Sequence, residues 1–285
     1  MAAPAVPSAH GHPHPHAPPP AYQDQYRAVD FWLFGCWPSP SACVMADDQL
    51  MKRFRACSEL LCERWVDANA PSKWEGVKFR DSDGRVTSIK ILGTNRAHCP
   101  YTAIPSMVGL LTGLQSLELN WLNKLTMLPE EIGHLTSLVT LNLTGCFVLA
   151  KLPDAIGRLA ALTTLDLSGC RSLKAINPAV GKLTSLRTLK MINICFVERL
   201  PAELGALASL RTLNLSGMEQ LEAIPLEFGQ LAEVTSLHMD GCTALTVPPA
   251  HMVGQPADVI IGFLAAFLIA QPGAMIVQVR ASGCF

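Results

Sequence analysis

The stretch LTTLDLSGCRSLKAINPAVGKLTS, residues 162–185, decides the fold because close copies of it recur along the chain. The copy LVTLNLTGCFVLAKLPDAIGRLAA directly precedes it at residues 138–161, and LRTLNLSGMEQLEAIPLEFGQLAE follows at residues 210–233. A unit that recurs at a fixed period predicts an array of stacked structural units, which limits what the protein can do.

The period of the repeat is 24 residues, and three apolar columns follow it. The first column is Leu114, Leu138, Leu162, Leu186, Leu210 and Val234. The second is Leu117, Leu141, Leu165, Leu189, Leu213 and Leu237, and the third is Leu119, Leu143, Leu167, Met191, Leu215 and Met239. An earlier unit begins at Val86 and contains extra residues in its loop, so the sequence predicts seven units.

Each unit divides into two halves with different periodicity. The first half, L-x-x-L-x-L, alternates like a short strand. The second half, with the form L-P-x-x-I-G-x-L, spaces its apolar residues three or four apart, which suits a 3₁₀ or loosely helical return segment. A glycine recurs in this half and fits either a position where a side chain would clash or one that needs a positive φ angle. The glycines are Gly109, Gly133, Gly157, Gly181, Gly205 and Gly229.

These motifs resemble the leucine-rich repeat family over residues 86 to about 250. The combination of LxxLxLxxC with LPxxIGxLxxL is most similar to repeats of plant-type intracellular immune receptors and Ras-suppressor-like proteins. The resemblance implies an α/β solenoid with a curved parallel sheet on its concave face and short return segments on its convex face. It also implies a protein-binding function without catalysis.

The ends of the array predict four regions. Residues 1–29 form a Pro/Ala/His-rich tail that we expect to be disordered, and residues 30–85 a helical amino-terminal cap. Residues 86–250 hold the repeats, and residues 251–285 a carboxy-terminal cap. The segment WEGVKF (74–79) resembles the amino-terminal cap of plant receptors. Ser72 and Phe79 stand where those caps carry cysteines, which predicts a reducing, cytoplasmic compartment.

Residues 259–279 leave two interpretations open. They carry no charge and are long enough to enter a bilayer, which would make the protein a membrane-tethered, receptor-like recognition module. Pro272 and Gly273 interrupt them, however, and favour a capping helix and strand over the last repeat.

No motif for catalysis or cofactor binding occurs in the sequence. Glycine-rich phosphate loops, zinc-protease and hydrolase motifs and Cys-x-x-Cys pairs are absent, so we expect no enzyme activity, no cofactor and no metal centre. The alternating histidines between His10 and His16 fit a weak transition-metal site or a simple spacer. A net charge of −1 gives no general attraction to nucleic acid. We expect Cys146, Cys170 and Cys242 to be buried, unreactive thiols.

The candidate binding residues lie between the leucines, on the predicted concave strands. One column of hydroxyl residues is uniform, whereas the next varies in charge and reads Lys90, Glu118, Asn142, Asp166, Lys190, Asn214 and His238. Arg187 and Arg211 are equivalent in neighbouring units, and Trp121 replaces a glycine. The predicted partner-binding residues are therefore Glu118, Trp121, Asp166, Arg187, Lys190, Arg211 and His238. We expect an acidic protein partner and a role in intracellular signalling or defence.

Overall fold

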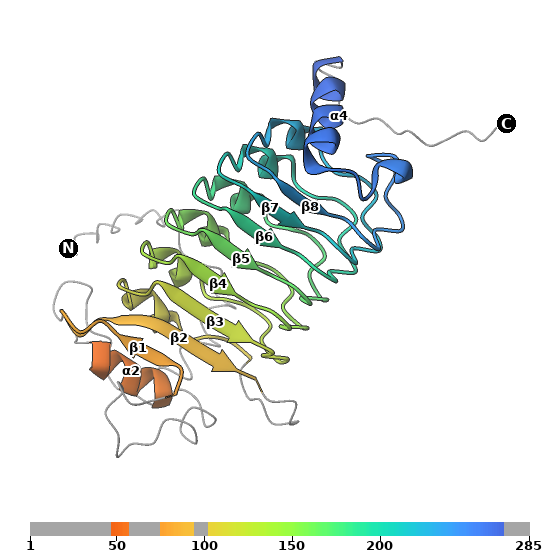
Figure 1. Cartoon of the computed structure of the whole chain (residues 1–285). Coiled ribbons are helices and arrows are strands. Elements are labelled where there is room, and N and C mark those ends of the chain that lie inside the picture. Colours follow the sequence, from red (N-terminus) through yellow and green to blue (C-terminus); the bar gives the residue numbers. More distant parts are fainter. Residues whose placement is uncertain (1–46, 57–74, 94–101, 271–285) are drawn as a thin grey trace, which may run out of the picture. The chain divides into compact units, whose positions relative to one another are not determined.

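The computed structural model describes residues 47–56, 75–93 and 102–270, and their strands form one eight-stranded sheet in sequential order (Figure 1). The strands are β1 (Val77–Phe79), β2 (Val86–Leu92), β3 (Ser116–Asn120), β4 (Thr140–Asn142), β5 (Thr164–Asp166), β6 (Thr188–Lys190), β7 (Thr212–Asn214) and β8 (Ser236–His238). Strands β2 to β8 are parallel, one for each of the seven units, and β1 pairs antiparallel with β2. The disordered tail expected at residues 1–29 lies outside the described residues.

The strand register confirms the frame read from the leucines. Leu117 pairs with Leu141, and Leu141 with Leu165, so equivalent residues of neighbouring units lie side by side. The 28-residue step of the first unit leaves this register intact, because Ile89 pairs with Leu117. The loop predicted to hold the additional residues of that unit lies largely outside the described residues.

The three apolar columns form continuous buried ladders between the sheet and the return segments. Leu165 and its neighbours in the second column are 0–1% exposed from β3 to β7. At the end of the array Leu237 is 8% exposed and Val234 6%, because no further repeat covers them. Each unit therefore depends on its neighbours for part of its buried apolar surface.

The return segments are 3₁₀ helices in every regular unit. They are η2 (Ser106–Leu110), η3 (Glu130–His134), η4 (Asp154–Arg158), η5 (Pro178–Lys182), η6 (Ala202–Ala206), η7 (Leu226–Gln230) and η8 (Ala250–Met252). A proline precedes most of them and Asn177 precedes η5, where its side chain accepts a hydrogen bond from the Ala179 N–H group. Asn177 thus satisfies one of the backbone donors at the start of η5, whereas a proline at this position has no N–H group of its own to leave unpaired.

Two columns of glycine have two different physical reasons. In the return segments there is no room for a side chain: a Cβ atom on Gly157 would lie 2.7 Å from the carbonyl oxygen of Ala179 in the next unit. A second column follows the strands and has positive φ angles, for example 76° at Gly169. The close approach of neighbouring units therefore explains the first column, and a left-handed turn explains the second.

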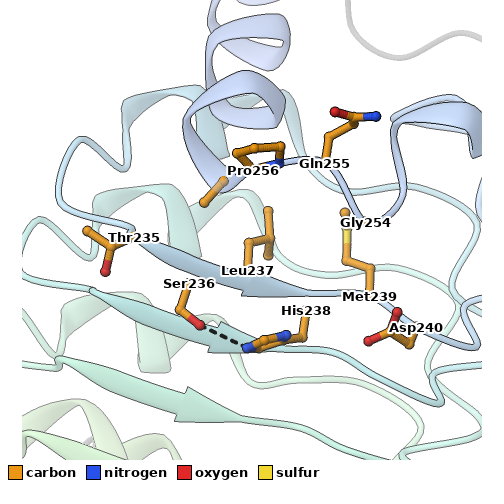
Figure 2. Close-up of a pocket in the computed structure, with 10 residues that line it drawn as sticks. Thr235, Ser236, Leu237, His238, Met239, Asp240, Gly254, Gln255 and Pro256 are labelled. Carbon is orange, nitrogen blue, oxygen red and sulfur yellow. Dashed lines mark hydrogen bonds between the residues drawn. The ribbon is translucent and has the colours of Figure 1, made fainter.

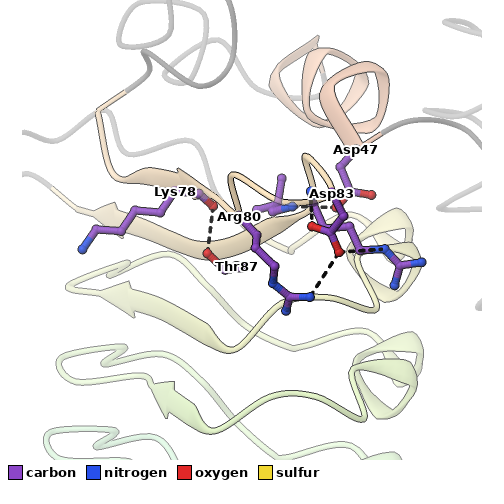
Figure 3. Close-up of polar contacts among 7 residues, drawn as sticks. Asp47, Lys78, Arg80, Asp83 and Thr87 are labelled. Carbon is purple, nitrogen blue, oxygen red and sulfur yellow. Dashed lines mark hydrogen bonds and ion pairs between the residues drawn. The ribbon is translucent and has the colours of Figure 1, made fainter.

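The amino-terminal cap joins a short helix and a hairpin to the first repeat (Figure 3). Helix α2 (Asp47–Ala56) buries Leu50 and Met51, and Asp47 Oδ2 accepts a 2.7 Å hydrogen bond from the backbone N–H group of Val86 at the start of β2. Asp83 accepts bonds from the Arg80 side chain (3.1 Å) and the Arg85 backbone (3.2 Å) in the β1–β2 turn. These contacts hold helix α2 and the β1–β2 hairpin on the first repeat.

Helix α4 (Ala257–Ala270) packs against the other end of the array. It buries Ala257, Ile260 and Leu264 and lies so close to η7 that a Cβ atom on Gly229 would meet the backbone of Ala265. Residues 257–270 are helical, whereas the strand expected after Pro272 lies outside the described residues. Within the described ranges, no helix combines the length and apolar character that crossing a membrane requires.

Candidate functional site

The exposed face of the sheet carries the two side-chain columns that the sequence predicts. The strand register aligns the uniform column, which consists of Ser88, Ser116, Thr140, Thr164, Thr188, Thr212 and Ser236. It also aligns the varied column of Lys90, Glu118, Asn142, Asp166, Lys190, Asn214 and His238. Four of the seven predicted binding residues, namely Glu118, Asp166, Lys190 and His238, therefore lie in one row across the sheet.

Two ion pairs join neighbours in this row. Lys90 Nζ lies 2.9 Å from Glu118 Oε2, and Lys190 Nζ lies 3.8 Å from Asp166 Oδ2. Both lysines are more than two-fifths exposed, so each pair contributes little to stability and can exchange its partner at small cost. Each pair neutralises two charges locally, whereas the sequence had left all four as separate charges.

Three members of the varied column also fold the turn that follows them. Asn142 Oδ1 accepts hydrogen bonds from the backbone N–H (2.9 Å) and hydroxyl (2.6 Å) of Thr144. Asp166 Oδ1 and Asn214 Oδ1 accept from the N–H groups of the serines two residues later, each at 3.0 Å. Asn or Asp in this pattern stabilises a turn. This role of Asp166 was not predicted, although the recurring [ND]-L-[ST]-G motif of the sequence indicates it.

Arg187 and Arg211 lie at the amino edge of the sheet, one residue before β6 and β7. The Arg211 backbone N–H donates to the Arg187 carbonyl at 2.8 Å, so the two are direct neighbours. Both line a shallow depression with Ala208, Ser209 and Glu233. Glu233 Oε2 lies 3.8 Å from Arg211 Nη2 and offsets the mutual repulsion of the arginines, whereas Arg187 forms no ion pair with any described residue.

Trp121 lies at the opposite edge, directly after β3. It has a φ angle of 60°, and its ring is 47% exposed and covers Gly145 of the next unit. The ring also meets Phe147 edge-on, with centroids 5.6 Å apart, and the Arg171 guanidinium lies 5.4 Å from the Phe147 centroid. Three strand spacings of about 4.8 Å plus the length of a strand separate Trp121 from Arg187. The predicted residues thus lie along the row and at both edges of the sheet rather than in one pocket.

His238 lines a hollow of about 390 Å³ between the last strand and the segment that leads into α4 (Figure 2). Its Nε2 atom lies 2.8 Å from Ser236 Oγ, and Asp240 lines the same hollow. The sequence placed His238 near Asp240 but did not predict the hollow, because the chain from Gly254 to Ala257 forms its other wall.

The three predicted inward cysteines are buried, as expected. Each thiol donates a hydrogen bond to a backbone carbonyl of the preceding unit; the Cys146 thiol lies 3.0 Å from the Leu119 oxygen. Burial raises the pKa of the Cys170 thiol far above its ordinary value, and it also raises the pKa of Cys242. Neutral, hydrogen-bonded thiols of this kind act in packing. Over residues 47–56, 75–93 and 102–270 no group of three acidic, His or Cys side chains could hold a metal ion.

This geometry defines the class of fold: a solenoid of stacked units, each with one strand and one 3₁₀ segment, that presents a parallel sheet. Residues 84–193 match the family model described as leucine-rich repeat region. The repeat region is therefore a leucine-rich-repeat solenoid, with β2 to β8 and the 3₁₀ segments as its two faces. The finer similarity to plant-type intracellular immune receptors stays a prediction.

Several solved structures are similar to parts of this chain. A leucine-rich repeat protein from Bacteroides eggerthii aligns with a TM-score of 0.52 at 11% identity, over 72% of this chain and 50% of its own. The leucine-rich repeat domain of the type III effector XopL is 31% identical with a TM-score of 0.41, over 45% of this chain and 43% of its own. The ectodomain of the receptor kinase SOBIR1 from Arabidopsis thaliana is 22% identical with a TM-score of 0.42, over 63% of this chain and 96% of its own.

The aligned part of this chain thus covers half or less of the length of the Bacteroides eggerthii protein and of the XopL domain. A search of curated protein sequences finds no match.

Proposed function

We propose that this chain is a non-catalytic scaffold that binds a partner protein on the exposed face of its sheet, in intracellular signalling or defence. The observation that carries the proposal is the strand register. It places seven side chains of five different types, from Lys90 to His238, in one row beside a uniform column of Ser and Thr. A row that varies beside a uniform column suits recognition of a specific protein surface.

The charge along this face favours an acidic contact on the partner. Arg187 forms no ion pair with any described residue, and the single acidic neighbour of Arg211 lies 3.8 Å away. A guanidinium group binds a carboxylate through two parallel hydrogen bonds, so both arginines can hold acidic side chains of a partner. Lys190, which faces Asp166, adds a further cation three residues beyond Arg187, at the end of β6.

Affinity capture from an extract of the source cells tests the proposal. The intact chain is compared with the double variant Arg187→Ala, Arg211→Ala and with the matched variant Arg158→Ala, Lys182→Ala on the return segments. We expect the first variant to capture less of the partner, and the amount that it captures to depend less on salt. Its thermal stability should be unchanged. Equal capture by all three proteins would place the partner elsewhere and overturn the assignment.

A further inference from the structure

The turns that follow strands β3 to β8 form one stacked row, which we call the carboxyl-edge row (residues 120–127, 144–151, 168–175, 192–199, 216–223 and 240–247). In Figure 1 it begins at the arrowheads of these strands. Backbone hydrogen bonds tie each turn to the next: the Trp121 N–H donates to the Thr144 oxygen (2.7 Å), and the Ser172 N–H to the Phe147 oxygen (3.0 Å). The side chains of the row therefore keep fixed relative positions.

Charge divides this row into two halves of opposite sign. The first three turns carry four basic residues and no acidic residue: Lys124, Lys151, Arg171 and Lys174. The last three turns carry four acidic residues and one basic residue: Glu198, Glu219, Glu222, Asp240 and Arg199. All nine side chains are exposed, and Arg199–Glu222 (3.3 Å) is the only ion pair that they form with described residues.

Exposed apolar side chains lie in the same row. Trp121 is 47% exposed, Val148 38% and Phe196 53%. Trp121 is held over Gly145 in a backbone conformation that costs energy for a residue with a large side chain, and Phe147 keeps the Arg171 guanidinium against its ring. Large apolar side chains between unpaired charges are typical of interfaces.

We propose that the carboxyl-edge row binds the same row of a second copy of this chain, with the two rows antiparallel about a twofold axis. This arrangement places the basic first three turns of one copy against the last three turns of the other, which together carry four acidic residues and one basic residue. Lys174 and Glu198 occupy the same position within their turns, and Lys151 lies one position from that of Glu222. Such an interface is self-complementary, as a twofold contact requires.

The charge division also disfavours other occupants. An anionic membrane or a nucleic acid that followed the whole row would attract the first three turns but repel Glu219 and Asp240 in the last two. A short acidic peptide would satisfy the basic half and leave the acidic half unpaired. Only a partner with the opposite order of charges pairs both halves, and a reversed second copy has that order.

The expected association is weak and depends on salt. Six turns at about 4.8 Å give a row about 24 Å long, which is shorter than a typical stable interface. Exposed ion pairs lose most of their attraction as ionic strength rises. The self-association is independent of the proposed partner on the sheet, since it uses neither Arg187 nor Arg211.

Sedimentation velocity of the full chain over a range of concentrations, at low and high salt, tests the proposal. The basic-half variant is Lys151→Glu, Lys174→Glu, and the acidic-half variant is Glu198→Lys, Glu222→Lys, so each changed residue of one variant faces a changed residue of the other. The control is Arg158→Glu, Lys182→Glu, which changes the net charge as the basic-half variant does but on the return segments. Circular dichroism shows whether each variant is folded.

We expect the wild type and the control to form dimers at low salt and to dissociate at high salt. Each half-variant alone should remain monomeric, with at least a tenfold weaker association, because the two reversed charges then face like charges when two copies of its row meet. An equimolar mixture of the two half-variants should form a mixed dimer, which a folding defect cannot produce. A monomeric wild type at all concentrations, dimers that persist in both half-variants, or a mixture that stays monomeric would each overturn the proposal.

Discussion

At the scale of single residues, Trp121 occupies a backbone conformation that the other regular repeats give to glycine or asparagine. Its φ angle of 60° matches those of Gly145 (75°), Gly169 (76°) and Asn193 (57°). A bulky residue in the left-handed region is unfavourable, and such strain persists where the surrounding structure holds it. Here the turn is fixed by the neighbouring units, and the ring gains contacts with Gly145 and Phe147.

The comparison of Trp121→Gly with Trp121→Ala separates the strain from the ring contacts. Both variants lose the indole ring, but only alanine retains the unfavourable φ angle. We expect the glycine variant to be more stable than the alanine variant by about 1–2 kcal/mol in urea unfolding. Equal stabilities would mean that the backbone at Trp121 relaxes out of the left-handed region.

Cys170 predicts a specific pH dependence of stability. Burial, and then the neighbouring Cys146, raise the pKa of its thiol in the folded chain above the ordinary value. The folded state therefore keeps the thiol proton, while the unfolded chain loses it above a pH of about 8.5. Because of this difference, the free energy of unfolding falls as the pH rises beyond that value. The loss amounts to at most about 1.4 kcal/mol per pH unit.

Urea unfolding of the wild type and Cys170→Ala under reducing conditions measures this effect. We expect the stability advantage of the wild type to shrink by about 2 kcal/mol between pH values of about 7.5 and 10. Titrating groups common to both proteins cancel in this difference. A constant advantage would show that the thiol ionises as readily in the folded chain as in the unfolded one.

At the scale of elements, the glycines of the return segments differ from the glycine in helix α4. A Cβ atom on Gly157 would lie 2.7 Å from the Ala179 carbonyl oxygen, whereas a Cβ atom on Gly262 would meet nothing within 4 Å. Gly157→Ala should therefore lower the free energy of unfolding by about 1–3 kcal/mol, through a forced separation of two units. Gly262→Ala should raise it by about 0.5–1 kcal/mol, because alanine favours the helix.

Thermal unfolding of these two variants measures both effects with the same chemical change. A destabilising Gly262→Ala would mean that the outer face of α4 is covered by another part of the chain. A neutral Gly157→Ala would mean that the units can move apart at little cost.

The same elements show how far the sequence can predict this fold. The 24-residue period predicted β2 to β8 and their register, because every inward position is filled by an apolar residue of similar size. The reason for the glycines was left open, since a clash with the next unit depends on the distance between units. The ion pair of Lys90 with Glu118 follows from the predicted columns once the lateral register is known, whereas the wall opposite His238 depends on how the carboxyl segment folds back.

At the scale of the whole molecule, the predicted binding residues spread across the sheet instead of converging. Arg187 and Arg211 lie at its amino edge and Trp121 at its carboxyl edge. The 24-residue period alone does not show that these residues lie on opposite edges of the sheet. Extended surfaces of this kind suit protein partners, which contact many side chains at once. The two edges can therefore serve different contacts, one with a partner protein and one with a second copy.

A solenoid also distributes stability according to position in the array, because each unit contacts only its neighbours. Leu165 is fully buried at the centre, and Leu264 is fully buried where α4 covers η7 at the end. Leu165→Ala leaves a cavity that should lower the global free energy of unfolding by about 2–5 kcal/mol. Leu264→Ala should loosen the cap alone, since the central units keep both of their neighbours.

Hydrogen exchange measured by mass spectrometry distinguishes these two effects. For Leu264→Ala we expect faster exchange in α4, η7 and β8 and unchanged exchange in β3 to β5. For Leu165→Ala we expect faster exchange from β3 to β7, because the break lies between two blocks of units that stabilise each other. Uniformly faster exchange in Leu264→Ala would show that the array unfolds only as a whole, and that α4 then stabilises every repeat through its contact with η7.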